Sequence, residues 1–297
     1  MLSMNQKRII PPSELPITED GRVYHLNLHP EELADNIILV GDPERVDLIA
    51  RFFDHVEFRE HHRELKTITG TVGNTRISAI STGMGTDNLD IVVTELDACA
   101  NINLQDRTVK EQHRSLRMIR LGTSGALNAE IKVESFVASN HVIGIDGVLH
   151  FYEHDPNLRC KDMEEAFIRH TKWNAEFARP YALKASPNLL NNVAQGCANG
   201  ITITANGFYG PQGRFVRLPL ARKDMNRLLE TFSVKSLPVL NYEMETSALY
   251  GLGQSLGHET LTICVIIANR LRGEFSSDYH NIMKKLIEQT LSRICNL

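Results

Sequence analysis

The sequence predicts one mixed α/β domain, because short apolar strands and amphipathic helices alternate along most of the chain. Three observations carry this prediction. Apolar runs end at glycine or polar turns, segments with helical spacing follow several of them, and neither a linker-like stretch nor an internal repeat divides the chain. With 297 residues, 42% of them hydrophobic, the chain is long enough to bury a large core.

Strands are predicted where apolar residues form short runs bounded by turn residues. These runs lie at residues 37–40, 67–72, 75–81, 118–119 (the end of a strand), 136–142, 200–204, 239–242 and 261–268. Gly73 and Asn74 separate the second run from the third and predict a hairpin, so we expect a mixed sheet.

Helices are predicted where apolar residues recur with a helical period. These segments lie at residues 46–52, 91–100, 189–197, 244–256 and 282–294. Pro43 suits the first position of the first helix, and Gly41 and Asp42 form the turn before it. A glycine turn is therefore expected at a helix N-terminus.

Two segments depart from the alternation of strands and helices. Residues 1–22 are polar, contain three prolines and lack a sustained period, so they are interpreted as an N-terminal arm of a domain that comprises residues 23–297. Residues 149–187 begin with a polar stretch that contains aromatic residues. We interpret them as an insertion that forms a helical excursion or a lid.

Composition excludes several classes of function. The formal charge is −4 and no extended basic run is present, so nucleic acid is not expected as a partner. No signal sequence opens the chain and no apolar segment approaches the length of a membrane span, which predicts a cytoplasmic protein without a membrane partner. The five cysteines lie far apart, so no disulfide frame or metal site is predicted.

Two stretches offer the chemistry of an anion site. The turn at Gly41 directs backbone N–H groups and a helix dipole toward an anion, with Arg45 as a cationic partner. Taken alone, this turn is weak evidence and is more often an ordinary helix start, with Asp42 as N-cap and Arg45 in solvent. Arg120 ends an apolar strand before the glycine-containing residues 121–125, which are interpreted as a turn. The alternative is a strand-end arginine with structural partners only.

Two further stretches offer groups for a sugar and a base. Glu243 and Glu245 flank Met244 at a strand-to-helix junction, where both carboxylates cannot cap the same helix and one is free to accept ribose hydroxyls. A dipole-stabilised acidic helix start remains the alternative. Gln212 and Arg214 can present an amide and a guanidinium to the edge of a base, although polar residues in a loop are common for solubility.

Taken together and in order, these stretches resemble the nucleoside phosphorylase family, which includes uridine phosphorylases and hexameric purine nucleoside phosphorylases. The resemblance extends from about residue 24 to the C-terminal helix and is greatest to the uridine enzymes. It implies a single-domain, three-layer mixed sheet, partly closed into a barrel and flanked by helices. It also implies reversible phosphorolysis of uridine to uracil and ribose 1-phosphate in pyrimidine salvage.

The resemblance assigns a role to each motif. The phosphate-binding residues are Gly41, Arg45, Arg63, Arg120 and Thr123. The ribose-binding residues are His25, Thr123, Glu243, Met244 and Glu245. The base-binding residues are Ser124, Gly125, Phe208, Gln212, Arg214, Ile267 and Ala268. Of these, Arg120, Gln212, Arg214 and Glu245 are expected to act in catalysis.

The resemblance also concerns assembly and cofactors. The stretches around His25 and Arg63 resemble pieces that family members donate across a subunit interface, which implies a homodimer that builds a hexamer. Phosphate is implied as co-substrate, with no other cofactor. Some family members carry a monovalent cation at the interface, but residues 85–88 depart from the family's sequence there.

Three alternatives to uridine cleavage remain. Purine enzymes of this fold place an aspartate near position 269, where this chain has Asn269, which argues against a purine nucleoside phosphorylase. A nucleosidase would have no use for Arg45, Arg63 and Arg120 as a phosphate clamp. The presence of ribose and base residues argues against an inert nucleoside-binding relative.

Overall fold

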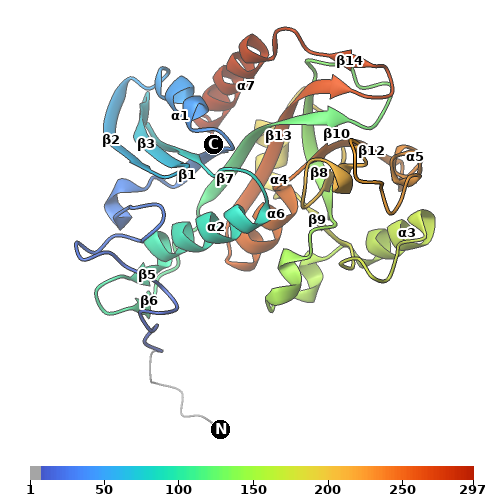
Figure 1. The fold of residues 1–297 in the computed structure, drawn as a ribbon. Coiled ribbons are helices and arrows are strands. Elements are labelled where there is room, and N and C mark those ends of the chain that lie inside the picture. The colour runs from blue at the N-terminus through green and yellow to red at the C-terminus, as the bar shows by residue number, and fades with distance from the viewer. Residues whose placement is uncertain (1–7) are drawn as a thin grey trace.

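The computed structural model describes residues 8–297, which form a large mixed sheet with helices packed on both sides (Figure 1). The strands of this sheet are β1 (Asn36–Val40), β2 (His55–His62), β3 (Leu65–Val72), β4 (Thr75–Ser81), β7 (Arg117–Ala126), β8 (Phe136–Gly144), β9 (Tyr181–Lys184), β10 (Ala198–Thr204), β11 (Ser233–Val234), β12 (Leu237–Glu243), β13 (Glu259–Asn269) and β14 (Glu274–Phe275). A separate ribbon pairs β5 (Ile102–Asn103) with β6 (Thr108–Val109).

The α-helices are α1 (Pro43–Ala50), α2 (Thr86–Asn101), α3 (Lys161–Thr171), α4 (Pro187–Val193), α5 (Met225–Glu230), α6 (Thr246–Ser255) and α7 (Tyr279–Ile294). Short 3-10 turns occur at Pro30–Glu32, Val148–Phe151, Pro156–Leu158 and Gly210–Gln212. None of the helices formed by residues 8–297 is long and apolar enough to cross a membrane.

Five strands of the sheet close into a ring. The strand order is β11-β12-β10-β8-β13-β7-β1-β4-β3-β2, and β12 also pairs antiparallel with β7 at Asn241–Ala126 and Tyr242–Gly125. Only two residue pairs make this closure, so the barrel formed by β7, β13, β8, β10 and β12 is partly closed, as expected. The closure brings the end of β12 beside the end of β7. Glu243, a predicted ribose residue, follows directly after the paired residues of β12, and the predicted phosphate residue Arg120 lies earlier on β7.

Most predicted elements are confirmed, including the β3–β4 hairpin. Residues 121–125 do not form a turn, however, because β7 continues through them to Ala126 and pairs with β13 along this stretch. Helix α2 starts at Thr86, five residues before its predicted start at 91, since Gly85 at φ 99° turns the chain into the helix. Helix α4 ends at Val193, short of residue 197.

Strand β2 was not predicted from the sequence. Its residues alternate between exposed and half-buried, and six of its eight residues are His, Glu or Arg. It forms the edge of the sheet, where polar side chains face solvent. A strand without a buried apolar face gives no hydrophobic period to detect.

The segment 149–187 forms part of the main sheet in addition to a helix. It contains α3, as the helical interpretation expected, and it ends in β9, which pairs with β8 and so belongs to the main sheet. Phe167 and Tyr181 from this segment are buried in the core.

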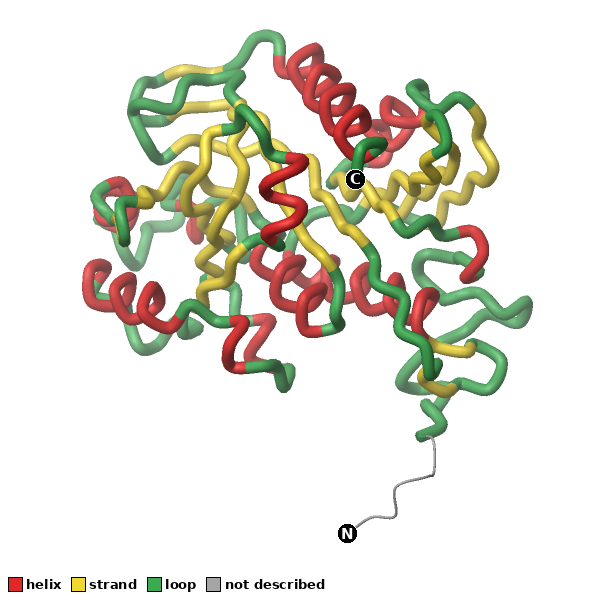
Figure 2. The backbone as a smooth tube through the Cα atoms, turned by 180° about the vertical axis from the view of Figure 1, so that it is seen from behind, coloured by secondary structure: helices red, strands yellow, loops and turns green. Residues whose placement is uncertain are grey.

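The described part of the N-terminal arm lies beside the β5–β6 ribbon (Figure 2). The guanidinium of Arg107 donates to the carbonyl oxygens of Ile10 at 2.8 Å and Pro11 at 3.3 Å, and also to that of Leu15. Leu15 is buried, and Ile17 pairs with Val23 in an isolated antiparallel β-bridge. Residues 8–22 are therefore anchored to the domain, whereas residues 1–7 lie outside the described residues.

Candidate active site

A buried arginine with two carboxylates lies where β7 meets β12. Arg120 is 5% exposed, and its Nη2 donates to Glu245 while its Nη1 lies 3.4 Å from Oε2 of Glu243. Glu243 and Glu245 are themselves 3% and 4% exposed. Three charges buried together must satisfy one another, so this cluster fixes the geometry of its surroundings.

Gly122 is required for the position of Arg120. The side chains of residues 120 and 122 point to the same face of β7, because residues two apart on a strand do so. A Cβ at Gly122 would lie 2.3 Å from Nη1 and 2.9 Å from Cζ of Arg120. The glycine therefore leaves room for the guanidinium to fold back over the strand. Gly122 has this role within a strand, whereas the sequence predicted a turn at this position.

The two carboxylates have different tasks. Glu243 accepts hydrogen bonds from the backbone N–H groups of Glu245 and Thr246, both at 2.9 Å, and from the hydroxyl of Thr204, so it caps α6. Glu245 instead accepts from the N–H of Gly85 at 2.8 Å and from Arg120. Glu245 is thus the carboxylate that the helix does not use, and its role at ribose stays a prediction.

Burial and ion pairing shift the pKa values of this cluster. Burial lowers the pKa of Arg120, but the carboxylates of Glu245 and Glu243 more than offset this, so the pKa is raised and the guanidinium stays charged. Burial raises the pKa of Glu243 despite the nearby Arg120. The thiol of Cys264, 3.7 Å from Nη1 of Arg120, has its pKa raised to about 11 by burial and is protonated.

The glycine turn after β1 faces this cluster. Asp42 is the N-cap of α1 and accepts from the N–H of Glu44 at 2.9 Å, as the simpler interpretation of the turn expected. Arg45 is not in free solvent, because its Nη1 donates to the carbonyl oxygen of Leu121 at 3.3 Å. This bond places Arg45 beside the backbone of the residue after Arg120, and burial together with the charge of Arg120 lowers the pKa of Arg45. Two like charges at close range favour an anion between them.

The predicted base-reading side chains are paired with each other. Arg214 Nη1 donates to Oε1 of Gln212 at 2.6 Å, and its guanidinium lies 3.6 Å from the centre of the Phe208 ring. Burial, with the charge of Arg270, lowers the pKa of Arg214 to about 10. The face of Phe208 therefore carries Arg214, and a base that stacks on this ring would have to displace the guanidinium.

The remaining predicted base residues lie on β7 and β13. Ser124 is buried and its hydroxyl accepts from the amide of Asn241 at 2.8 Å. Gly125 pairs with Ala268, next to an irregularity in the β7–β13 register. Ile267 and Ala268 are half-buried.

Sequence reasoning missed Arg270 and Tyr242. Arg270 Nη1 donates to the carbonyl oxygen of Gln212 at 2.7 Å and so anchors the base loop. The Tyr242 hydroxyl is buried without a hydrogen-bond partner among residues 8–297, and burial raises its pKa while Arg270 and Arg214 lower it. For Arg270, the available signal was an arginine directly after the last residue of β13, Asn269.

His25 and Arg63 do not join the Arg120 cluster within the chain. His25 Nδ1 pairs with Oε1 of Glu95 at 2.6 Å, and its backbone N–H also donates to that carboxylate. Glu95 lies on α2, ten residues from Gly85, which contacts Glu245. At 1.5 Å per residue, these two points are about 15 Å apart along the helix. Arg63 is exposed in the β2–β3 turn, with a left-handed φ of 57°.

Asp97, His113 and His258 form a separate cluster whose potential ligand atoms lie within 4.8 Å of one another. Nδ1 of His258 accepts from the N–H of Leu116 at 3.2 Å, which places its proton on Nε2, where it donates to Asp97 at 3.1 Å. A metal at Nε2 would need this proton elsewhere. Hydrogen bonding therefore accounts for the cluster.

Comparison with known proteins identifies the class. Residues 35–295 match the phosphorylase superfamily, and the chain belongs to this family. A uridine phosphorylase of Thermococcus kodakarensis is 27% identical over 269 residues, which cover 89% of this chain and 83% of that protein. A DeoD-type purine nucleoside phosphorylase of Streptococcus suis is 30% identical over 251 residues, or 82% and 84% of the two chains.

A solved structure supports the same assignment. The nucleoside phosphorylase of Trypanosoma brucei, described as showing uridine phosphorylase activity, superimposes with a TM-score of 0.84 at 29% identity. The match covers 95% of this chain and 100% of the other. The resemblance to nucleoside phosphorylases and the expected barrel fold are confirmed.

Replacing Arg120 by Met should destabilise the protein by about 3–5 kcal/mol at pH 8, because two buried carboxylates lose their cation. The loss should be smaller at pH 5. A carboxyl whose folded pKa lies above its unfolded value stabilises the fold less as pH rises past the unfolded value, and losing Arg120 raises the pKa of Glu243 further.

Urea unfolding at both pH values measures this difference. The control is Arg117→Met on the same strand, whose partly exposed pair with Glu259 at 3.5 Å should contribute less than about 1 kcal/mol. Equal losses for Arg120→Met at pH 5 and pH 8 would show that the carboxylates do not depend on Arg120.

Proposed function

We propose that the protein is a uridine phosphorylase, which cleaves uridine with phosphate to give uracil and ribose 1-phosphate. The observation that carries the proposal is the position of Arg120, which donates to Glu245, while Arg45 donates to the carbonyl oxygen of the next residue, Leu121. An anion bound by the two arginines would lie next to a sugar held by Glu245. The uridine phosphorylases among the relatives support the same substrate.

The arrangement suits phosphorolysis of a glycosidic bond. A phosphate oxygen attacks C1′ of the ribose, the bond from C1′ to the base nitrogen breaks, and the electron pair leaves with the base. The transition state carries positive charge on the sugar, which the adjacent phosphate stabilises. Gln212 and Arg214 would stabilise the negative charge that develops on uracil, and Glu245 would hold the ribose hydroxyls.

The position of Asn269 favours a pyrimidine over a purine. Its amide donates to the carbonyl oxygens of Asn128 at 3.0 Å and Ile131 at 2.7 Å, and its oxygen accepts from the N–H groups of Leu271 and Arg272. This side chain is fully used in a turn and offers no carboxylic proton for a purine. Purine nucleoside phosphorylases are also among the relatives, so cleavage of purine nucleosides is the alternative function.

We further propose a site shared between two subunits of a homo-oligomer, as the family resemblance implies for His25 and Arg63. Glu95 holds His25 about 15 Å along α2 from the Gly85 contact with Glu245. A second copy that presents His25 and Arg63 to this site would complete the ribose and phosphate pockets. A hexamer, an interface cation and a cytoplasmic location stay predictions.

Uridine cleavage should require phosphate, and Arg120→Ala should lower kcat and raise the phosphate KM. Loss of a charge-assisted contact to the nucleophile removes about 2–4 kcal/mol, or roughly 30-fold to 1000-fold in rate. Uracil release is measured with and without phosphate. Equal cleavage in phosphate-free buffer would indicate a hydrolase.

Arg214→Ala should reduce uridine turnover strongly and leave the phosphate KM nearly unchanged, because Arg214 lies in the base loop and not at the Arg45–Arg120 anion site. Inosine should be a poor substrate for the wild-type protein, since the base-reading groups would be left unpaired by a purine edge. Steady-state kinetics with both nucleosides tests this. Comparable kcat/KM for inosine and uridine would contradict the assigned base.

Inactive Arg63→Ala and Arg120→Ala subunits, mixed under exchange conditions, should regain activity. If one subunit donates Arg63 to the site that contains the other's Arg120, some mixed sites hold both wild-type residues. A mixture of Arg45→Ala with Arg120→Ala is the matched control, because both residues lie in one chain's site. No recovery in the mixture of Arg63→Ala with Arg120→Ala, or full activity of a monomer, would show that the site is not shared.

A further inference from the structure

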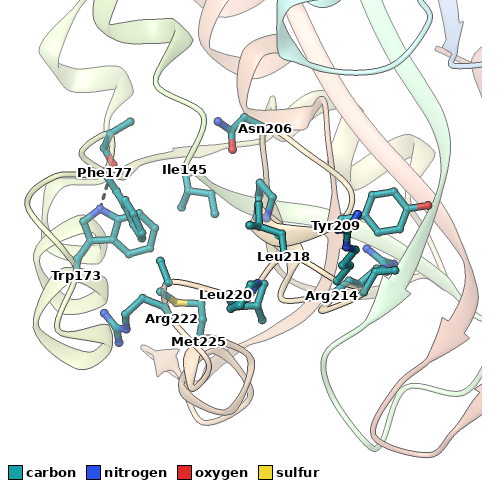
Figure 3. A pocket seen from close by; sticks show the side chains of 17 residues that line it. Ile145, Trp173, Phe177, Asn206, Tyr209, Arg214, Leu218, Leu220, Arg222 and Met225 are labelled. Carbon is teal, nitrogen blue, oxygen red and sulfur yellow. Dashed lines mark hydrogen bonds between the residues drawn. The ribbon is translucent and has the colours of Figure 1, made fainter.

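A cavity of about 730 Å³ lies beside the base loop and takes no part in the proposed reaction (Figure 3). Trp173 and Phe177, from the segment between α3 and β9, lie at one end, and Tyr209 and Arg214 lie at the other. Cavities of this size commonly hold small molecules. Of the predicted catalytic residues, only Arg214 lines it.

The walls of the cavity are apolar and partly aromatic. Trp173 and Phe177 supply aromatic rings, and aliphatic or thioether groups come from Ile145, Leu218, Leu220 and Met225. The Trp173 Nε1 donates to the carbonyl oxygen of Ala178 at 3.0 Å, so the indole presents its apolar surface without an unpaired polar atom. These walls suit a flat apolar ring system.

The charged groups of the cavity are all cationic. Its lining contains Arg214, Arg217 and Arg222, and no Asp or Glu. Arg222 is already paired with Asp224 and with the carbonyl oxygens of Thr171 and Lys172. Arg217 has no hydrogen bond or ion pair to any residue in the described range 8–297. An anionic group on a ligand would therefore find a free guanidinium.

We propose that this cavity is a second ligand site, which binds a flat apolar ring system that carries a negatively charged group. The apolar walls bind the rings, and Arg217 pairs with the charge. Arg214 and Tyr209 belong both to this cavity and to the base loop, so the site borders the catalytic centre without including Arg120 or Glu245.

The competing occupant is the loop itself. Phe215, Val216 and Leu218 are 63%, 74% and 84% exposed, and a movement of this loop would pack their side chains into the cavity. In that case the cavity would close when nucleoside binds. The experiment must therefore separate an added ligand from a moving loop.

Trp173 is the single tryptophan of the chain and lines this cavity, so tryptophan fluorescence has one source, in the cavity wall. The probe is 1-anilinonaphthalene-8-sulfonate, an aromatic anion that accepts excitation energy from tryptophan. Titration of the full-length wild-type protein should give saturable energy transfer from Trp173 at one probe per chain. This binding measurement needs no turnover, so it is independent of the proposed enzyme activity.

Two variants and one control define the site. Arg217→Gln should weaken probe binding about fivefold, as expected for one partly exposed charge pair. Ala221→Phe, which fills the cavity from an exposed position in its wall, should abolish it. Arg227→Gln removes an exposed arginine of α5 that does not line the cavity, and it should bind the probe like wild type. N-phenyl-1-naphthylamine, which lacks the sulfonate, should bind the wild type more weakly.

Three results would overturn the proposal. Equal probe affinity in wild type and Ala221→Phe would place the probe elsewhere. Equal affinity for the neutral and anionic probes would remove the role of Arg217. Displacement of the probe by uridine in the Arg214→Ala variant, where the shared wall is missing, would show that the loop closes into the cavity.

Discussion

The buried cluster of Arg120, Glu243 and Glu245 constrains the rest of this structure. A charge removed from water is tolerated only with partners at short range, and each member of the cluster supplies such a partner to the others. Further groups complete the set: Gly85 donates its N–H to Glu245, and Thr204 donates its hydroxyl to Glu243. The cluster therefore ties β7, β10, β12, α2 and α6 to one point.

The barrel makes this cluster possible. Closure between β12 and β7 brings Tyr242 opposite Gly125 and so places Glu243 within reach of the Arg120 side chain. The cap on α6 then uses one carboxylate and leaves the other for Arg120. The strand pairing that closes the barrel therefore also positions the groups proposed to hold ribose and phosphate.

Much of the fold was predictable from the sequence, as was the grouping of Arg120 with Glu243 and Glu245, and the exceptions have physical causes. Gly122 and Gly125 suggested a turn after Arg120, but both glycines lie within a strand, where Gly122 makes room for the side chain of Arg120. Strand β2 has no apolar face to detect. The pairing of Arg214 with Phe208 and Gln212 depends on loop conformation, and the absence of His25 from the cluster depends on the length of α2. Neither is visible in residue spacing.

The most direct test of the account is a double-mutant cycle on kcat/KM for uridine with Arg120→Met, Glu245→Gln and the double variant. If Arg120 and Glu245 act as one unit that joins phosphate to ribose, the double variant should lose little more than the worse single variant. If the two losses multiply independently in the double variant, the arginine and the carboxylate act separately and the central claim is wrong.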